Sequence, residues 1–155
     1  KIPTLIQNCV NQAEYDGVDG TIIMCTGSFH EITHKKPLII PQPLLHSTIK
    51  NVAHGKKVGI ITPDQSQVDQ VISWWKESGV DTEVVSGSPY QDLESITHAA
   101  MQLITKDPYL VCLDCMGYTL EMKRIVSEIT QKPVILPRTL VARIADEMFG
   151  GDLFN

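Results

Sequence analysis

The sequence predicts an α/β protein with mostly parallel sheets flanked by helices. Short apolar runs that are typical of buried strands alternate with segments whose apolar residues recur every three or four positions, as in amphipathic helices. Parallel pairing follows because a helix between two strands returns the chain to the same end of the sheet. At 155 residues, 43% of them hydrophobic, the chain is long enough to bury a core.

The first third of the chain is predicted to begin and end with a helix. The expected order is a helix over residues 6–15, a strand over 20–25, an extended proline-bounded segment over 37–43 and a helix over 44–52. Glycine follows both helices, in Asp16-Gly17 and in His54-Gly55, and is suited to the left-handed conformation that often ends a helix.

Two similar start signals mark helices in the middle of the chain. Thr62-Pro63-Asp64-Gln65 has the form of a capping box with proline at the first helical position, and Ser88-Pro89-Tyr90-Gln91 repeats it. Each signal follows a predicted strand, over residues 58–61 and 80–85. The apolar faces of the two helices consist of Val68, Val71, Ile72 and Trp75, and of Leu93, Ile96, Ala100 and Leu103.

The last third is predicted to add two strands, each followed by a helix. The strands are expected over residues 109–113 and 133–136, and the helical faces are Met122, Ile125, Val126 and Ile129, then Leu140, Val141, Ile144 and Met148. Polar segments at residues 56–57 and 131–133 are the predicted crossings between two lobes. We therefore expect residues 57–132 to form one lobe, and residues 1–56 with 133–155 to form the other.

Charge and hydropathy narrow the class of protein. The net charge of -5 gives no electrostatic reason to bind nucleic acid, and the apolar runs are far below the ~18 residues that cross a bilayer. The sequence has no recognisable secretory signal, and three of its four cysteines lie in apolar runs, which favours reduced thiols. We expect a cytoplasmic protein that binds neither nucleic acid nor membrane, and a homo-oligomer is left open.

Cysteines follow two of the predicted strands. Cys25 begins the segment Cys25-Thr26-Gly27-Ser28, and Cys115 lies in the turn after the strand over residues 109–113. Ligands of open α/β sheets bind at the carboxyl ends of strands, so we expect the two thiols to face each other across a cleft. One thiolate could then remove a proton next to a substrate carboxylate while the other thiol returns one. The alternative is that each cysteine is a small buried hydrophobic residue.

Hydroxyl and cationic side chains near these turns are predicted to bind the carboxylate. They are Thr26, Ser28, Ser88, Tyr90, Tyr118, Thr119 and Arg138. The alternative is structural, because Ser88 and Thr119 suit helix caps and Arg138 suits an exposed first helical turn.

Two motifs offer a metal or redox alternative to this site. Cys112 and Cys115 form a C-x-x-C pair, but the pair crosses the end of a strand, whereas thioredoxin-type motifs lie at a helix start. Residues 30–34 match H-E-x-x-H, the pattern in which His30 and His34 would hold zinc. The motif runs into Lys35-Lys36-Pro37, which favours a surface turn and leaves a zinc hydrolase as the less favoured reading.

Four segments together resemble the AroM family, which is similar to the cofactor-independent aspartate/glutamate/hydantoin racemase superfamily. They are Cys-Thr-Gly after a strand, Ser-Pro-Tyr before a helix, Leu-Asp-Cys-Met-Gly-Tyr-Thr, and Arg-Thr-Leu-Val-Ala-Arg. The resemblance covers about residues 16–149. It implies two pseudo-symmetric α/β lobes with one cysteine from each at the cleft, and it leads us to expect a first lobe without its N-terminal strand.

The resemblance also implies a function. The paired cysteines would correspond to Cys25 and Cys115, and their neighbouring hydroxyl and backbone groups to Thr26, Gly27, Gly117 and Thr119. We expect a racemase- or isomerase-like enzyme that acts on a small carboxylate or amino-acid-like ligand without metal or cofactor. The alternative from another class is a non-catalytic small-molecule-binding or regulatory protein on the same fold.

Overall fold

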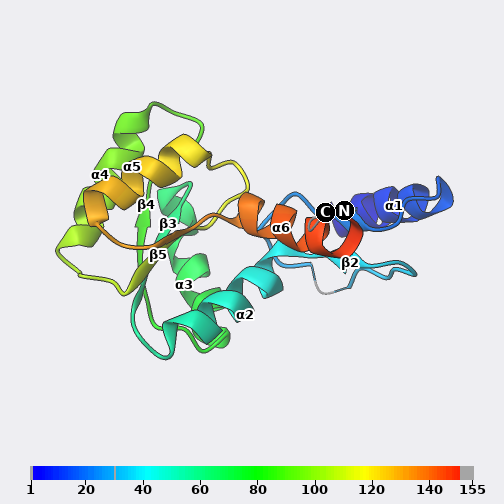
Figure 1. Cartoon of the computed structure of the whole chain (residues 1–155), viewed down its shortest axis with the longest axis horizontal. Helices are drawn as coiled ribbons and strands as arrows, with labels where there is room; N and C mark the ends of the chain where they lie inside the picture. Colours follow the sequence, from blue (N-terminus) through cyan, green and yellow to red (C-terminus); the bar gives the residue numbers. More distant parts are fainter. Residues whose placement is uncertain (1, 30, 151–155) are drawn as a thin grey trace.

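The computed structural model describes residues 2–29 and 31–150, and it confirms the predicted α/β class. All strand pairs described are parallel. The larger sheet has the order β4-β3-β5-β6, and a second sheet pairs β1 with β2 (Figure 1). The strands are β1 (Thr21–Ile22), β2 (Leu38–Ile39), β3 (Val58–Thr62), β4 (Thr82–Ser86), β5 (Leu110–Leu113) and β6 (Val134–Ile135).

Helices cover both faces of the larger sheet. On one face α4 (Leu93–Ile104) and α5 (Leu120–Thr130) share a core with Ile61, Val111 and Leu113. On the other face α2 (Pro41–Ala53) and α3 (Val68–Glu77) share a core with Val58, Ile60, Leu110 and Cys112. Successive residues of β3 and β5 thus enter opposite cores, which explains why these strands are continuously apolar in sequence.

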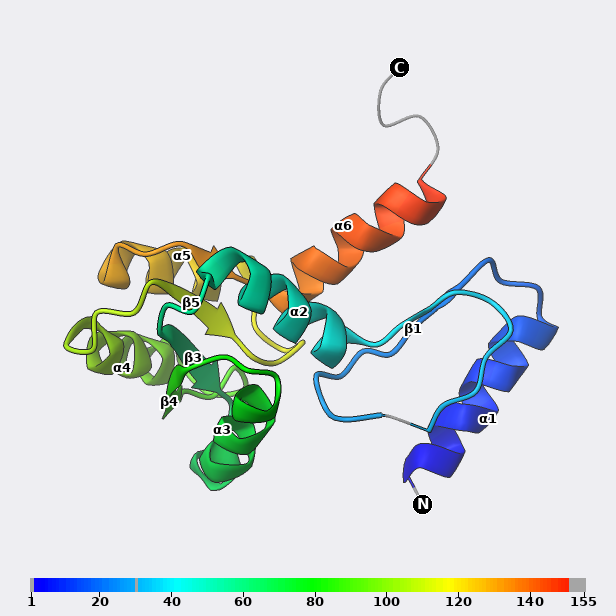
Figure 2. The same ribbon diagram turned by 90° about the horizontal axis from the view of Figure 1, so that it is seen from below.

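The smaller sheet packs against α6 (Pro137–Phe149), and α1 (Ile2–Tyr15) contacts β1. Figure 2 shows β1 and α1 standing apart from the larger sheet. A third core joins Ile39 of β2 and Val141 of α6 to Met116, which comes from the turn after β5. The apolar side chain of Met116 therefore ties the two parts of the molecule together beside the predicted site.

The predicted lobe boundaries at residues 57 and 132 stay a prediction. The structure adds that β6 pairs with β5, and that α2 packs on the larger sheet through Leu45 and Ile49. Both elements fall in the segments assigned to the first lobe, and residues 151–155 of that lobe lie outside the described residues.

The predicted capping boxes at Thr62 and Ser88 were wrong. Thr62 is the last residue of β3, and Asp64 caps the short 3₁₀ helix η1 (Gln65–Gln67) by accepting from the Ser66 N–H at 2.8 Å. Asp92 is the N-cap of α4. An aspartate follows each predicted cap by two or four residues, and it caps at least as well as serine or threonine. The helices therefore begin later, and the strand-to-helix segments are longer.

Other helices and strands also begin or end at residues other than those predicted. Pro41 and Pro137 are the first residues of α2 and α6, because proline fits the first helical position and needs no N–H there. The extended segment predicted over residues 37–43 shrinks accordingly to β2. The strand predicted over residues 20–25 forms ladder pairs only at Thr21 and Ile22, so Cys25 lies three residues beyond its end.

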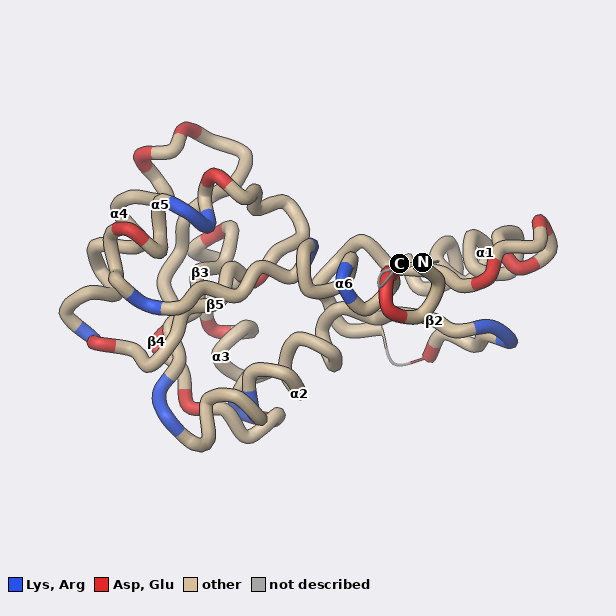
Figure 3. The backbone as a smooth tube through the Cα atoms, viewed as in Figure 1, with Lys and Arg blue, Asp and Glu red and all other residues tan. Residues whose placement is uncertain are grey.

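Acidic and basic residues are interspersed along the larger part of the molecule (Figure 3). The lysines and arginines of the described chain are spread over several elements, as the low content of basic runs in the sequence suggested. Within residues 2–29 and 31–150, no helix has both the length and the apolar composition to cross a membrane.

Candidate active site

A cleft of about 480 Å³ opens at the carboxyl ends of β3 and β5. The strand order β4-β3-β5-β6 sends the chain to opposite sides after these neighbouring strands, and such a switch point leaves room for a ligand. The lining residues come from the segments after β1, β3 and β5, from η1 and α3, and from the loop before α4. They are Met24, Cys25, Thr26, Gly27, Thr62, Pro63, Gln67, Gln70, Val71, Trp74, Tyr90, Asp114, Cys115, Met116 and Gly117.

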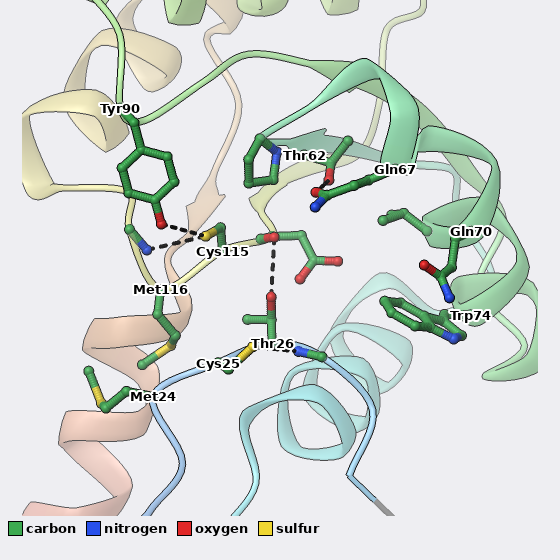
Figure 4. A pocket seen from close by; sticks show the side chains of 15 residues that line it. Met24, Cys25, Thr26, Thr62, Gln67, Gln70, Trp74, Tyr90, Cys115 and Met116 are labelled. Atoms are coloured by element: carbon green, nitrogen blue, oxygen red, sulfur yellow. Dashed lines mark hydrogen bonds between the residues drawn. The ribbon is translucent and has the colours of Figure 1, made fainter. Parts of the chain in front are cut away.

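Cys25 and Cys115 reach this cleft from different sheets (Figure 4). Cys25 is exposed and Cys115 is half-buried, so neither is a sealed core residue. Each sulfur accepts a hydrogen bond from the glycine N–H two residues later: Gly27 N lies 3.4 Å from Cys25 Sγ, and Gly117 N lies 3.4 Å from Cys115 Sγ. The two cysteines thus have the same local geometry.

Tyr90 adds a hydroxyl beside one of the thiols. Its oxygen lies 3.7 Å from Cys115 Sγ, and this contact raises the pKa of the Tyr90 phenol. The ring packs directly over Gly117, where a Cβ would lie 2.6 Å from the Tyr90 hydroxyl oxygen. Glycine at position 117 therefore allows the close approach of Tyr90 to Cys115.

Asp114 is a buried carboxyl group between the two cysteine turns. Its Oδ2 accepts from Trp75 Nε1 at 2.8 Å, and its backbone carbonyl accepts from Thr26 Oγ1 at 3.3 Å. Oδ1 is buried and has no hydrogen-bond partner among the described residues. Burial raises the pKa of Asp114 to about 6, against the opposing effect of the hydrogen bond from Trp75.

Behind Asp114, His46 of α2 fixes the indole that holds the carboxyl group. The imidazole stacks on Trp75 with ring centroids 3.8 Å apart and an interplanar angle of 24°. His46 Nδ1 lies 2.6 Å from Ser78 Oγ, and burial lowers the pKa of His46 to about 4. A neutral imidazole at pH 7 therefore packs against the fully buried Trp75.

Several predicted binding residues do not line the cleft: Ser28, Ser88, Tyr118, Thr119 and Arg138. Thr119 caps α5 by accepting from Met122 N at 3.3 Å, and Arg138 Nη1 donates to the Tyr118 carbonyl at 3.4 Å. The buried Tyr118 hydroxyl donates to the Gly87 carbonyl at 2.6 Å. The structure thus gives Tyr118, Thr119 and Arg138 contacts of their own outside the cleft.

The Tyr118 contact supports the loop that carries Ser88 and Tyr90. We expect Tyr118→Phe to lower the free energy of unfolding by roughly 1–2 kcal/mol, because the Gly87 carbonyl loses its donor. Urea denaturation measures this change. The matched control is Tyr15→Phe, at a ring that is 87% exposed, and it should leave stability unchanged. Equal midpoints for Tyr118→Phe and the wild type would contradict the prediction.

The structure shows where the residues of the metal and redox motifs lie. His30 lies outside the described residues, and residues 31–37 contain no helix, whereas the zinc motif needs its histidines one helical turn apart. His34 Nδ1 lies 2.8 Å from the Lys36 carbonyl oxygen. Within the described chain, no group of three or more His, Cys, Asp or Glu residues could hold a metal ion. Cys112 is a free thiol buried within β5, and burial raises its pKa well above the usual value.

Sequence reasoning missed most of the wall that faces the cysteines. Gln67, Gln70 and Trp74 are spaced by three and four positions, so they share one face of the helical segment after β3. That spacing was a usable signal, because the segment begins at the carboxyl end of a central strand. Asp114 was also missed as a site residue, although it directly precedes Cys115.

Comparisons with known proteins bear on the family and the fold. Residues 1–149 match the family model described as AroM protein, whereas no curated protein sequence matches the chain. The maleate isomerase Iso from Pseudomonas putida S16 has a TM-score of 0.74 at 15% identity, over 92% of this chain and 69% of that one. An arylmalonate decarboxylase has a TM-score of 0.74 at 14% identity, over 97% and 76%. Picrophilus torridus aspartate racemase has a TM-score of 0.58 at 20% identity, over 93% and 68%. These similarities establish a fold of the aspartate/glutamate racemase type.

Proposed function

The chain belongs to the AroM family, and from this premise we propose a racemase- or isomerase-like enzyme that transfers a proton at the carbon next to a carboxylate. Cys25 and Cys115 act as the base and acid pair, and the substrate is a small acid. The reaction needs no cofactor in this proposal, because both proton carriers are side chains of the protein.

The observation that carries the proposal is the pair of equivalent cysteine turns at one cleft. A glycine N–H points at each sulfur from 3.4 Å, where it can stabilise a thiolate. The turns come from different sheets, so a ligand between them can offer one face of a carbon to each sulfur. Solved structures of the same fold carry the names of a maleate isomerase, an arylmalonate decarboxylase and an aspartate racemase, which is consistent with a small acid.

The proposed step balances without a redox partner. One thiolate takes the proton from the carbon, and the C–H electron pair moves into the carboxylate to give an enediolate. The thiol on the other face then gives its proton to the same carbon, and the two cysteines exchange protonation states. Thr26 and Tyr90 bring hydroxyls to the cleft, where they can donate to the developing oxyanion.

The test is exchange of the α-hydrogen for deuterium, followed by NMR in D₂O over a panel of amino and hydroxy acids. We expect at least one acid to lose its α-hydrogen signal with wild-type protein. Cys25→Ser should reduce the exchange rate by at least about a hundredfold for the enantiomer whose α-hydrogen faces Cys25. An acid that binds in a calorimeter but never exchanges would refute the enzyme and favour the small-molecule-binding alternative. Exchange that persists undiminished for both enantiomers in Cys25→Ser would refute the two-cysteine mechanism.

A further inference from the structure

The charge of the cleft lining points to a narrower substrate class. We infer that the substrate carries a single carboxylate, and at its other end an uncharged or cationic hydrogen-bond donor such as an amide or amine. A dicarboxylate of the same shape should bind less tightly. The inference rests on the proposed function for the placement of the reacting carboxylate at the cysteines, but its own test is binding.

The described lining of the cleft holds no counter-ion for a second carboxylate. Among the described lining residues none is Lys, Arg or His, and Asp114 is the one carboxyl group. Arg138 lies outside the lining, where it donates to the Tyr118 carbonyl. A dianionic ligand would therefore bring its second charge into a cleft that has a carboxyl group of the same sign and no cation.

The Asp114 carboxyl group lacks one hydrogen-bond donor among the described residues. Trp75 satisfies Oδ2, but Oδ1 is buried without a partner among the described residues, and an unpaired buried carboxyl oxygen is unfavourable. Asp114 lines the cleft, so an N–H of a ligand bound there is the group that would supply the missing hydrogen bond. A ligand carboxylate could not do so, because it has only acceptors.

Beside Asp114, the described lining carries polar groups that are uncharged. Gln67 and Gln70 place amide groups there, and Trp74 places an indole ring, across the cleft from Tyr90 and Cys115 (Figure 4). An amide both donates and accepts, so it matches another amide or an amine at the far end of the ligand. The ring face of Trp74 also suits a cation better than an anion.

The inference is tested by comparing glutamine with glutamate and asparagine with aspartate, because the two members of each pair have nearly the same shape. Both enantiomers of each are titrated into wild-type protein by calorimetry at pH 7.5. We expect each amide to bind at least about tenfold more tightly than its dicarboxylate, from the repulsion at Asp114. Asp114→Asn should shrink this ratio by at least about fivefold, whereas Glu121→Gln makes the same chemical change on the exposed face of α5 and should leave the ratio unchanged.

The wild-type ratio alone decides the inference, whether or not Asp114→Asn folds. A dicarboxylate that binds as tightly as its amide overturns it, and so does failure of all four acids to bind at millimolar concentration. If a dicarboxylate binds and exchanges its α-hydrogen through Cys25 and Cys115, the inference fails and the proposed function stands. If the amides bind selectively without exchange, the inference stands and the proposed function fails.

Discussion

Alanine at either cleft cysteine is expected to slow conversion between enantiomers strongly while leaving α-hydrogen exchange in one enantiomer, a different one for each variant. Cys25 and Cys115 approach the cleft from different sheets, so in the proposed mechanism each serves one face of the substrate carbon. The remaining thiol can still remove a proton from its own face and return a deuteron there. Conversion needs an acid on the other face, and its loss should slow conversion by roughly a thousandfold.

The measurement uses each pure enantiomer of the substrate that the exchange panel identifies. NMR follows deuterium incorporation, and chiral chromatography follows conversion, for Cys25→Ala and Cys115→Ala. The matched control is Cys9→Ala, which removes an exposed thiol from α1, outside the cleft lining, and should behave as the wild type. Two variants that exchange the same enantiomer would contradict the assignment of one cysteine to each face.

Central strands and their turns were predictable from sequence for a physical reason. β3 and β5 are buried on both faces, so they read as continuous apolar runs, and parallel strands bring their carboxyl ends to one edge. That reasoning led us to expect Cys25 and Cys115 at one cleft, and both line it, although β1 and β5 belong to different sheets. The choice of helix caps was not predictable in this way. Thr62 and Asp64 both suit a cap, and only the length of β3, set by its pairing with β4, decides between them.

The second wall of the cleft depends on tertiary packing. Gln67, Gln70 and Trp74 share a helical face by spacing alone, but whether that face meets the cleft depends on which residues of α3 enter the core. Trp75 and Val71 fill that core, and Trp74, one position away, is thereby turned to the cleft side. Sequence periodicity identifies the face, and only the packed structure identifies what it meets.

Asp114→Asn should also change how stability depends on pH, with an effect of several kcal/mol. Burial raises the folded-state pKa of Asp114 to about 6 from an ordinary value of 3.8. The raised pKa means that stability from this group is full below about pH 4 and is lost as pH rises through 6. The loss amounts to roughly 3 kcal/mol for a shift of about two pKa units. Asparagine does not titrate, so the free energy of unfolding of Asp114→Asn should rise by this amount relative to that of the wild type between pH 4 and pH 7.

The difference between the two proteins is the quantity to measure, because His46 titrates in the opposite sense. Burial lowers the folded-state pKa of His46 to about 4, so its contribution to stability is lost as pH falls from about 6.5. The two groups partly cancel in the wild type, but His46 is common to both proteins and drops out of the difference. Urea denaturation at pH 4, 5, 6 and 7 gives that difference, with Glu121→Gln as the variant expected to show no trend. A difference that does not change with pH would contradict the prediction and would mean that a donor already reaches Oδ1. A pH dependence of the difference that becomes weaker under saturating glutamine would show that the ligand contacts the buried carboxyl group.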